Sequence, residues 1–159
     1  MNNSIAEAGR LLAKNPCLDF VQNVLGVNNP AGLIPLIQKA TLNVNATGYS
    51  SDGPTVHAEA TWDNAGNYSI DFYKPFFTEL RPKPLESGRI ILSGPVPMEE
   101  RTRDPKAQGQ DTLHEGIHLW TGKTDIQLAN LFLKPGQKPF TDKLKASEFW
   151  HEKLKKKCN

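Results

Sequence analysis

Residues 112–130 read Thr-Leu-His-Glu-Gly-Ile-His-Leu-Trp-Thr-Gly-Lys-Thr-Asp-Ile-Gln-Leu-Ala-Asn. This stretch contains the strongest local signal in the sequence. The five residues from His114 to His118 match the pattern H-E-x-x-H. On a helix, positions i and i+4 lie on one face, one turn apart. Apolar residues flank the two histidines at the spacing of a buried helical stripe, and Gly122 is a suitable helix terminator. We therefore predict a helix over 110–121 that carries both histidines on one face.

Two imidazoles on one helix face can bind a single Zn²⁺ at about 2.0–2.1 Å. Glu115 would lie beside them as the general base that takes a proton from a zinc-activated water and passes it to a leaving amine. The chain has 4 histidines in all, so a chance match to the motif is improbable. An alternative stays open, because Thr112 and Glu115 also have the spacing of a capping box. In that case His114 and His118 would be surface residues at the start of a helix.

A catalytic zinc site needs a third protein ligand, and Asp125 is the first candidate. Gly122 can turn the chain back after the helix and bring Asp125 towards the metal. The alternative role for Asp125 is in the first turn of the next helix, beside Thr124. Other candidate ligands lie on the last predicted helix and on one face of a predicted strand: Glu148, His151, Glu152, His57 and Glu59.

The remaining periodicity predicts helices before and after a short set of strands. In the N-terminal part, helices are expected over 4–14 (with Ser4 as N-cap), 16–25 and 30–39. Strands are expected over 55–62, 68–73 and 89–93, the first two forming a hairpin. A solvated loop over 94–109 and helices over 124–133 and 141–157 complete the prediction, with Thr141 as N-cap and Leu144, Phe149 and Leu154 facing inward. This order predicts one α+β domain over 1–159, with a small antiparallel or mixed sheet between terminal helices.

Composition narrows the classes of function. Lys+Arg 19 against Asp+Glu 17 gives a net charge of +2, with no electrostatic footprint for nucleic acid or a membrane surface. No apolar run is long enough for a membrane helix, and the N-terminus is unlike a signal peptide. We expect a chain that is cytoplasmic as expressed, or one delivered as part of a larger secreted protein. Cys17 and Cys158 could form one disulfide that closes almost the whole chain, or stay as two free thiols.

The stretch from Leu113 to Asn130 resembles the zincin metallopeptidases. Within them, Gly122 and Thr124-Asp125 resemble the aspzincin, or deuterolysin-like, pattern, in which an aspartate is the third zinc ligand; Leu128 stands where that pattern has tyrosine. The resemblance implies a zinc-dependent endopeptidase with Zn²⁺ bound by His114, His118 and Asp125, and a protein or peptide substrate. An oxyanion-stabilising residue is expected among Tyr49, Tyr68, Tyr73 and His151.

The same stretch, with a terminal helix ending in Lys-Cys, also resembles C-terminal domains of bacterial RHS/YD-repeat proteins. This resemblance implies a toxin or effector domain, with an immunity protein or the parent shell as further partners. Two alternatives stay open. The chain could be a catalytically inactive zinc-binding module of a larger shell protein, or an interaction domain in which the motif is accidental.

Overall fold

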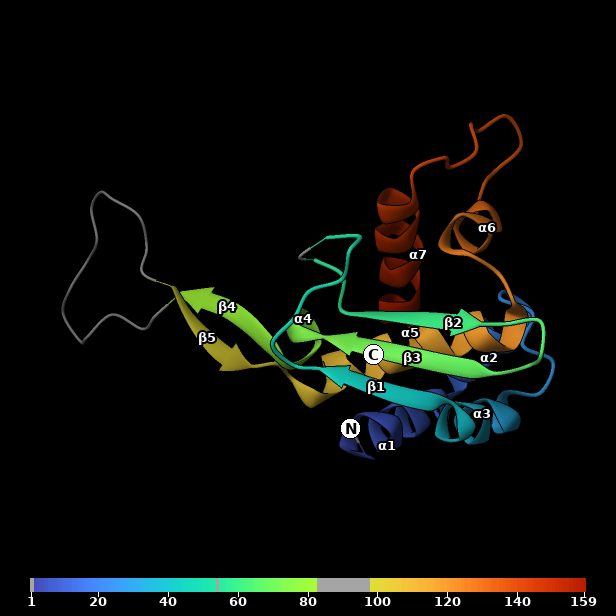
Figure 1. Ribbon diagram of the computed structural model, residues 1–159. Helices are drawn as coiled ribbons and strands as arrows, with labels where there is room; N and C mark the ends of the chain where they lie inside the picture. Colours follow the sequence, from blue (N-terminus) through green and yellow to red (C-terminus); the bar gives the residue numbers. More distant parts are fainter. Residues whose placement is uncertain (1, 54, 83–97) are drawn as a thin grey trace.

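A computed structural model describes residues 2–53, 55–82 and 98–159. Its centre is a three-stranded mixed sheet in the order β1-β3-β2 (Figure 1). Strand β1 (Thr41–Asn45) pairs parallel to β3 (Tyr68–Tyr73), and β2 (Ala58–Trp62) pairs antiparallel to β3 on the other side. The predicted α+β class, the small mixed sheet and the β2–β3 hairpin are thereby confirmed. Strand β2 is an edge strand, which leaves one of its sides free for a cleft.

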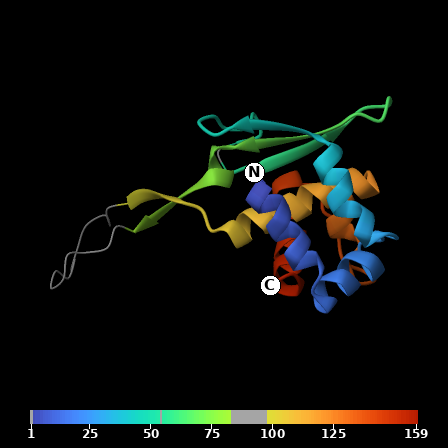
Figure 2. The same ribbon diagram turned by 90° about the horizontal axis from the view of Figure 1, so that it is seen from below.

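Helices gather on one side of this sheet, as Figure 2 shows from below. The terminal helices that we predicted are present, with bounds that differ by a few residues. The helical elements are α1 (Asn2–Leu12), α2 (Asn15–Asn23), the 3-10 turn η1 (Pro30–Gly32), α3 (Leu33–Lys39), α4 (Lys74–Phe77), α5 (Pro105–Thr121), α6 (Asp125–Asn130) and α7 (Lys143–Lys157).

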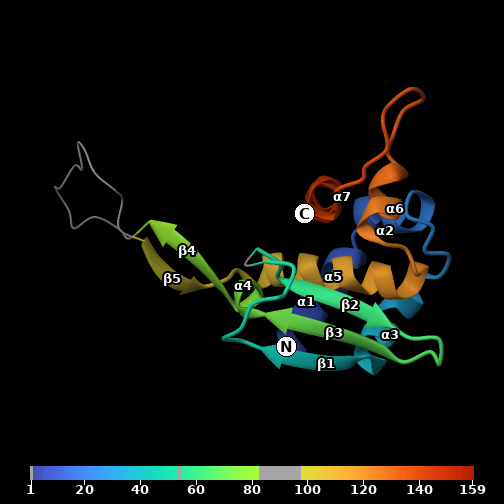
Figure 3. The same ribbon diagram turned by 45° about the horizontal axis from the view of Figure 1, so that its top comes forward.

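Helix α5 is the central element of the core. It packs against α1, α3, α7 and strand β2 (Figure 3). Leu113 and Ile117 are fully buried, as their spacing predicts. Gly116 meets α3 closely: a Cβ added there would lie 2.8 Å from Ile37 Cγ1 and nearer still to Ile37 Cδ1. The close approach of α3 therefore favours a glycine inside this helix, which accounts for a residue that lowers helix propensity.

The predicted loop over 94–109 is wrong for its described residues. Strand β5 (Met98–Thr102) pairs antiparallel with β4 (Thr78–Pro82), and the two extend away from the body of the protein in Figure 1. Helix α5 then begins at Pro105, where the Asp104 side chain accepts a hydrogen bond from the Lys106 N–H. An N-cap followed by proline is a strong start signal, and the expectation of a charged loop overlooked it. The predicted strand over 89–93 lies outside the described residues.

Three further expectations need correction. Ser4 is buried and lies inside α1, which begins at Asn2, so it is not the N-cap residue, and the Glu7 carboxylate pairs with Arg10. Helix α7 is capped by Asp142, whose side chain accepts a hydrogen bond from the backbone N–H of Lys145, and Thr141 precedes the cap. Leu144 is 44% exposed because it faces the cleft described below. Strand β1 was missed although Leu42 and Val44 alternate with polar residues, because the segment is short, largely exposed, and a strand only through its pairing with β3.

A disulfide joins Cys17 of α2 to Cys158, the residue that follows α7. Both cysteines are fully buried. The structure thus decides the alternative that the sequence left open, and it fixes the C-terminal helix to the N-terminal helices. In the described part of the chain, no helix combines the length and apolar character needed to cross a bilayer.

Candidate metal centre

Both motif histidines lie well inside α5. The helix begins at Pro105 with its own N-cap, so Glu115 does not cap a helix start. His114 and His118 are consecutive on one face, with ring centroids 4.9 Å apart, and both are buried. The alternative of two surface histidines in a first helical turn is therefore wrong.

Asp125 is placed by the turn after α5. Gly122 adopts the left-handed conformation with φ 61° and ends α5, as predicted. Thr124 then caps α6 through a capping box with Gln127, which leaves Asp125 in the first turn with its carboxylate directed at the histidines. Both roles considered for Asp125 are thus realised together: it begins α6 and it faces the two imidazoles.

Three potential ligand atoms converge at this point. His114 Nε2 lies 3.1 Å from His118 Nε2, and each of these nitrogens lies 3.2 Å from Asp125 Oδ1. Ligands about 2.0–2.1 Å from a tetrahedral metal are separated by roughly 3.3 Å. The observed triangle is close to one face of such a tetrahedron. His114, His118 and Asp125 therefore form a group that could hold a metal ion.

Neighbouring groups orient each ligand. His118 Nδ1 lies 2.6 Å from the Lys123 carbonyl oxygen, so its proton is held there and Nε2 is left as an acceptor. The indole of Trp150 stacks on His114 with ring centroids 3.8 Å apart. Its Nε1–H also donates to Asp125 Oδ1 at 2.7 Å. Trp150 is fully buried, so one residue of α7 supports two of the three ligands.

The charge states of two of the three ligands suit a cation site. Burial lowers the pKa of His114 to about 3, which keeps its imidazole neutral. Burial by itself raises the pKa of Asp125, but hydrogen bonds with the two histidines outweigh it and hold the pKa well below its usual range. Burial by itself lowers the pKa of His118, but the hydrogen bond with Asp125 and the negative charges of Glu115 and Asp125 together outweigh burial and raise the pKa. A metal would therefore compete with a proton on His118.

Glu115 lies between the ligand group and the sheet. Its Oε2 accepts a hydrogen bond from the backbone N–H of Ala60 in β2 at 2.7 Å, and its Oε1 lies 3.9 Å from His114 Nε2. Burial raises the pKa of Glu115 to about 8. A carboxyl group with a pKa near neutrality, adjacent to the ligand atoms, is suited to accept a proton and return it.

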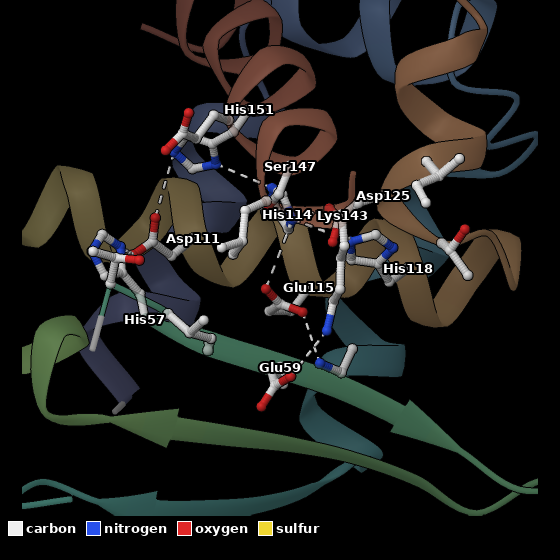
Figure 4. A pocket seen from close by; sticks show the side chains of 18 of the residues that line it. His57, Glu59, Asp111, His114, Glu115, His118, Asp125, Lys143, Ser147 and His151 are labelled. Atoms are coloured by element: carbon white, nitrogen blue, oxygen red, sulfur yellow. Dashed lines mark hydrogen bonds and ion pairs between the residues drawn. The ribbon is translucent and has the colours of Figure 1, made fainter. Parts of the chain in front are cut away.

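A cleft of about 770 Å³ opens over this group. Its walls come from β2, α5, α6 and α7, and Figure 4 shows Glu115, His114 and His118 facing into it. Lys143 of α7 reaches across the cleft to Glu59 of β2, with Nζ 3.3 Å from Oε1 (Figure 4). The ligand group of His114, His118 and Asp125 is therefore buried, and it borders a cleft large enough for a substrate segment.

The rival ligands lie elsewhere in the same cleft. His57 bonds to Asp111 at 2.9 Å, and Glu59 accepts from Ser50 and Tyr73. His151 faces His114 Nδ1, on the opposite side of that ring from the ligand group. The ligand group found among the described residues contains none of the five rivals: His57, Glu59, Glu148, His151 and Glu152.

The candidates for oxyanion stabilisation are mostly remote. Tyr49 borders a separate hollow near Lys74, and the Tyr73 hydroxyl is bound to Glu59. Neither of them nor Tyr68 lines the cleft, whereas His151 does. Among the described candidates, His151 alone lies in the right region.

Sequence reasoning missed Trp150, Asp111 and Arg103. Asp111 precedes His114 by three positions and therefore shares its helix face, a signal that could have been used. Arg103 forms a buried ion pair with Asp111, but it lay in the segment expected to be a loop. No sequence pattern indicated Trp150, because its contacts join α7 to α5 and α6 across the fold.

Comparison with known proteins adds no relative: no family model, curated protein or solved structure matches this chain.

Proposed function

We propose that this protein is a zinc-dependent endopeptidase. The observation that carries the proposal is the convergence of His114 Nε2, His118 Nε2 and Asp125 Oδ1, with the Glu115 carboxylate beside them in an open cleft. Two imidazoles and one carboxylate are a donor set typical of catalytic zinc, with a position left for substrate or water.

His114, His118 and Asp125 would hold the ion. Zinc bound there supplies Lewis acidity, which polarises a carbonyl and makes water a stronger acid at neutral pH. The three ligands are buried and individually oriented, so their arrangement requires little rearrangement on binding.

Glu115 would act as the general base. The Ala60 N–H holds Oε2, so the carboxylate is fixed with Oε1 towards the ligand group. In that position Oε1 can accept a proton from a water in the cleft. It can then return the proton to the amine released when a peptide bond breaks.

The edge of β2 favours an extended peptide as substrate. The Ala60 N–H lies on the cleft side of β2, where it is occupied by Glu115, and the His57 carbonyl accepts from Tyr73 N–H on the opposite side of the strand. Because the two sides alternate along a strand, Ala58 and Trp62 also present backbone groups to the cleft. A substrate segment could pair with these groups as an added strand.

The cellular setting is also a proposal. A buried disulfide is typical of proteins that mature in oxidising compartments. This supports delivery outside the cytoplasm, as expected for an effector domain of an RHS-type protein with a protein substrate.

Metal analysis and a peptide-library assay test the function together. We expect one zinc per chain in the wild type, and in Glu115→Gln full zinc content with cleavage reduced at least 100-fold. Glu99→Gln, an exposed-strand carboxylate of β5 paired with Arg101, is the control and should retain both properties. Absence of zinc would refute the proposal. Zinc without cleavage would indicate a non-catalytic metal-binding module.

A further inference from the structure

We propose that His151 and Asp111 are positioning residues for His114, acting through one hydrogen bond and one electrostatic contact behind the ligand group. The inference rests on the metal site of the proposed function, but it concerns how this chain holds one ligand. None of the three residues needs to touch the substrate.

The first link joins two histidines on different helices. His114 of α5 and His151 of α7 face each other through their Nδ1 atoms, which are 3.1 Å apart (Figure 4). One Nδ1 must carry the proton and the other must accept it. Since His114 Nε2 points at Asp125 and His118, a metal-binding state requires the His114 proton on Nδ1. His151 Nδ1 is then the acceptor.

The second link follows from the first. If His151 Nδ1 accepts, its proton lies on Nε2, and that atom faces Asp111 Oδ1 at 3.6 Å. A carboxylate at this distance attracts the N–H electrostatically and favours this tautomer. The two contacts together therefore favour one arrangement of protons, with His151 protonated on Nε2 and His114 protonated on Nδ1.

Asp111 is itself held firmly. It is buried, with Arg103 paired to its carboxylate and His57 Nδ1 2.9 Å from Oδ2. Arg103 supplies a positive charge that stabilises the buried carboxylate. Asp111 and His114 lie one turn apart on helix α5. The two outer members of the contact series therefore belong to one rigid helix, and His151 of α7 lies between them.

The geometry also excludes His151 as a ligand to the same ion. Its Nδ1 approaches the far side of the His114 ring, and the Trp150 indole covers the face of that ring. His114 is thus fixed by an edge contact from His151 and a face contact from Trp150. Outer hydrogen bonds of this kind commonly change metal affinity by about 10–100-fold.

The test is the zinc dissociation constant, measured by competition with a chromogenic chelator. His151→Phe keeps a planar ring but removes both nitrogens, and we expect zinc affinity to fall by about 10–100-fold. His151→Gln can accept from His114, and it should recover most of the wild-type affinity. Ser147→Ala, one turn earlier on α7 in the same cleft, is the matched control and should bind zinc like the wild type.

A second readout needs no metal. In the metal-free protein the Asp125 carboxylate competes for the proton at His114 Nε2, so nitrogen-15 NMR should show a smaller fraction of His114 protonated on Nδ1 in His151→Phe than in the wild type. Unchanged zinc affinity in His151→Phe would overturn the proposal. Equal losses in the Phe and Gln variants would also overturn it, because they would indicate a packing role. A wild type that binds zinc with this His151 dependence but cleaves no peptide would refute only the peptidase function.

Discussion

The Trp150 indole N–H donates to Asp125 Oδ1 at 2.7 Å while its ring stacks on His114. One side chain therefore fixes the position of two candidate ligands that belong to different helices. This arrangement makes helix α7, which carries none of the three converging ligands, a structural part of the candidate metal centre.

Replacing Trp150 by Phe separates these two contacts. Trp150→Phe keeps an aromatic ring against His114 but removes the donor to Asp125, so we expect about 10-fold or greater loss of zinc affinity. Chelator competition measures it. Trp62→Phe, a partly exposed tryptophan of β2, is the control and should leave zinc affinity unchanged. Equal affinity in both variants would contradict a role for the indole N–H.

Metal removal should lower thermal stability. Zinc present at 100 times its dissociation constant adds about 2.7 kcal/mol to the free energy of unfolding, which corresponds to roughly 5–10 °C for a chain of this size. Calorimetry with added zinc and with a chelator measures the shift. His118→Ala should show no zinc-dependent shift, and an identical melting temperature of the wild type in both conditions would argue against a metal centre.

The close approach of Gly116 to Ile37 predicts that mutations at these two positions have non-additive effects on stability. Gly116→Ala should destabilise the protein by about 1–2 kcal/mol, because crowding against Ile37 outweighs the gain in helix propensity. Ile37→Val removes the most crowded atom. The double mutant should therefore lose less stability than the sum of the single mutants in urea unfolding. Strict additivity would show that α3 moves away without cost.

The buried Asp111–Arg103 pair predicts sensitivity to acid. Burial by itself raises the pKa of Asp111, but the hydrogen bond with His57 and the charge of Arg103 outweigh it and hold the pKa below its ordinary 3.8. Its stabilising contribution is therefore present above about pH 4 and is lost as the pH falls further. Between about pH 7 and pH 3, metal-free Asp111→Asn should lose less unfolding free energy than the wild type. The prediction would be contradicted if the free energy of unfolding fell equally steeply with pH in the wild type and in Asp111→Asn.

The disulfide should contribute substantially to stability. In the loop-entropy account, a crosslink with a sequence separation of 141 disfavours the unfolded chain by about 5 kcal/mol. We expect Cys17→Ser with Cys158→Ser to lower the urea midpoint strongly. Reduction of the wild type should have a similar effect, with the native fold retained in the oxidised control. If reduction left the urea midpoint unchanged, the packing of α7 alone would be sufficient for the stability of the protein.

Much of the fold was predictable because the signals are local. Alternation in β2 and β3 and the helical periods near both termini placed most elements. Strand β1 and the β4–β5 pair were missed because β1 and β5 are mostly exposed and each strand depends on pairing with another strand; β4 and β5 are also rich in charged residues. The start of α5 was missed although Asp104-Pro105 signals it locally.

The sequence by itself determined that the two histidines and Glu115 share one helix and that the chain turns back after it towards Asp125. These features are local, because they lie within a few residues of one another on α5, its terminator and the start of α6. The tertiary structure decided everything that crosses the fold. Examples are Trp150 against Asp125, His151 against His114, and Ala60 against Glu115. Such contacts depend on how α7 and β2 pack against α5, and no spacing along the chain encodes the distance between separate elements.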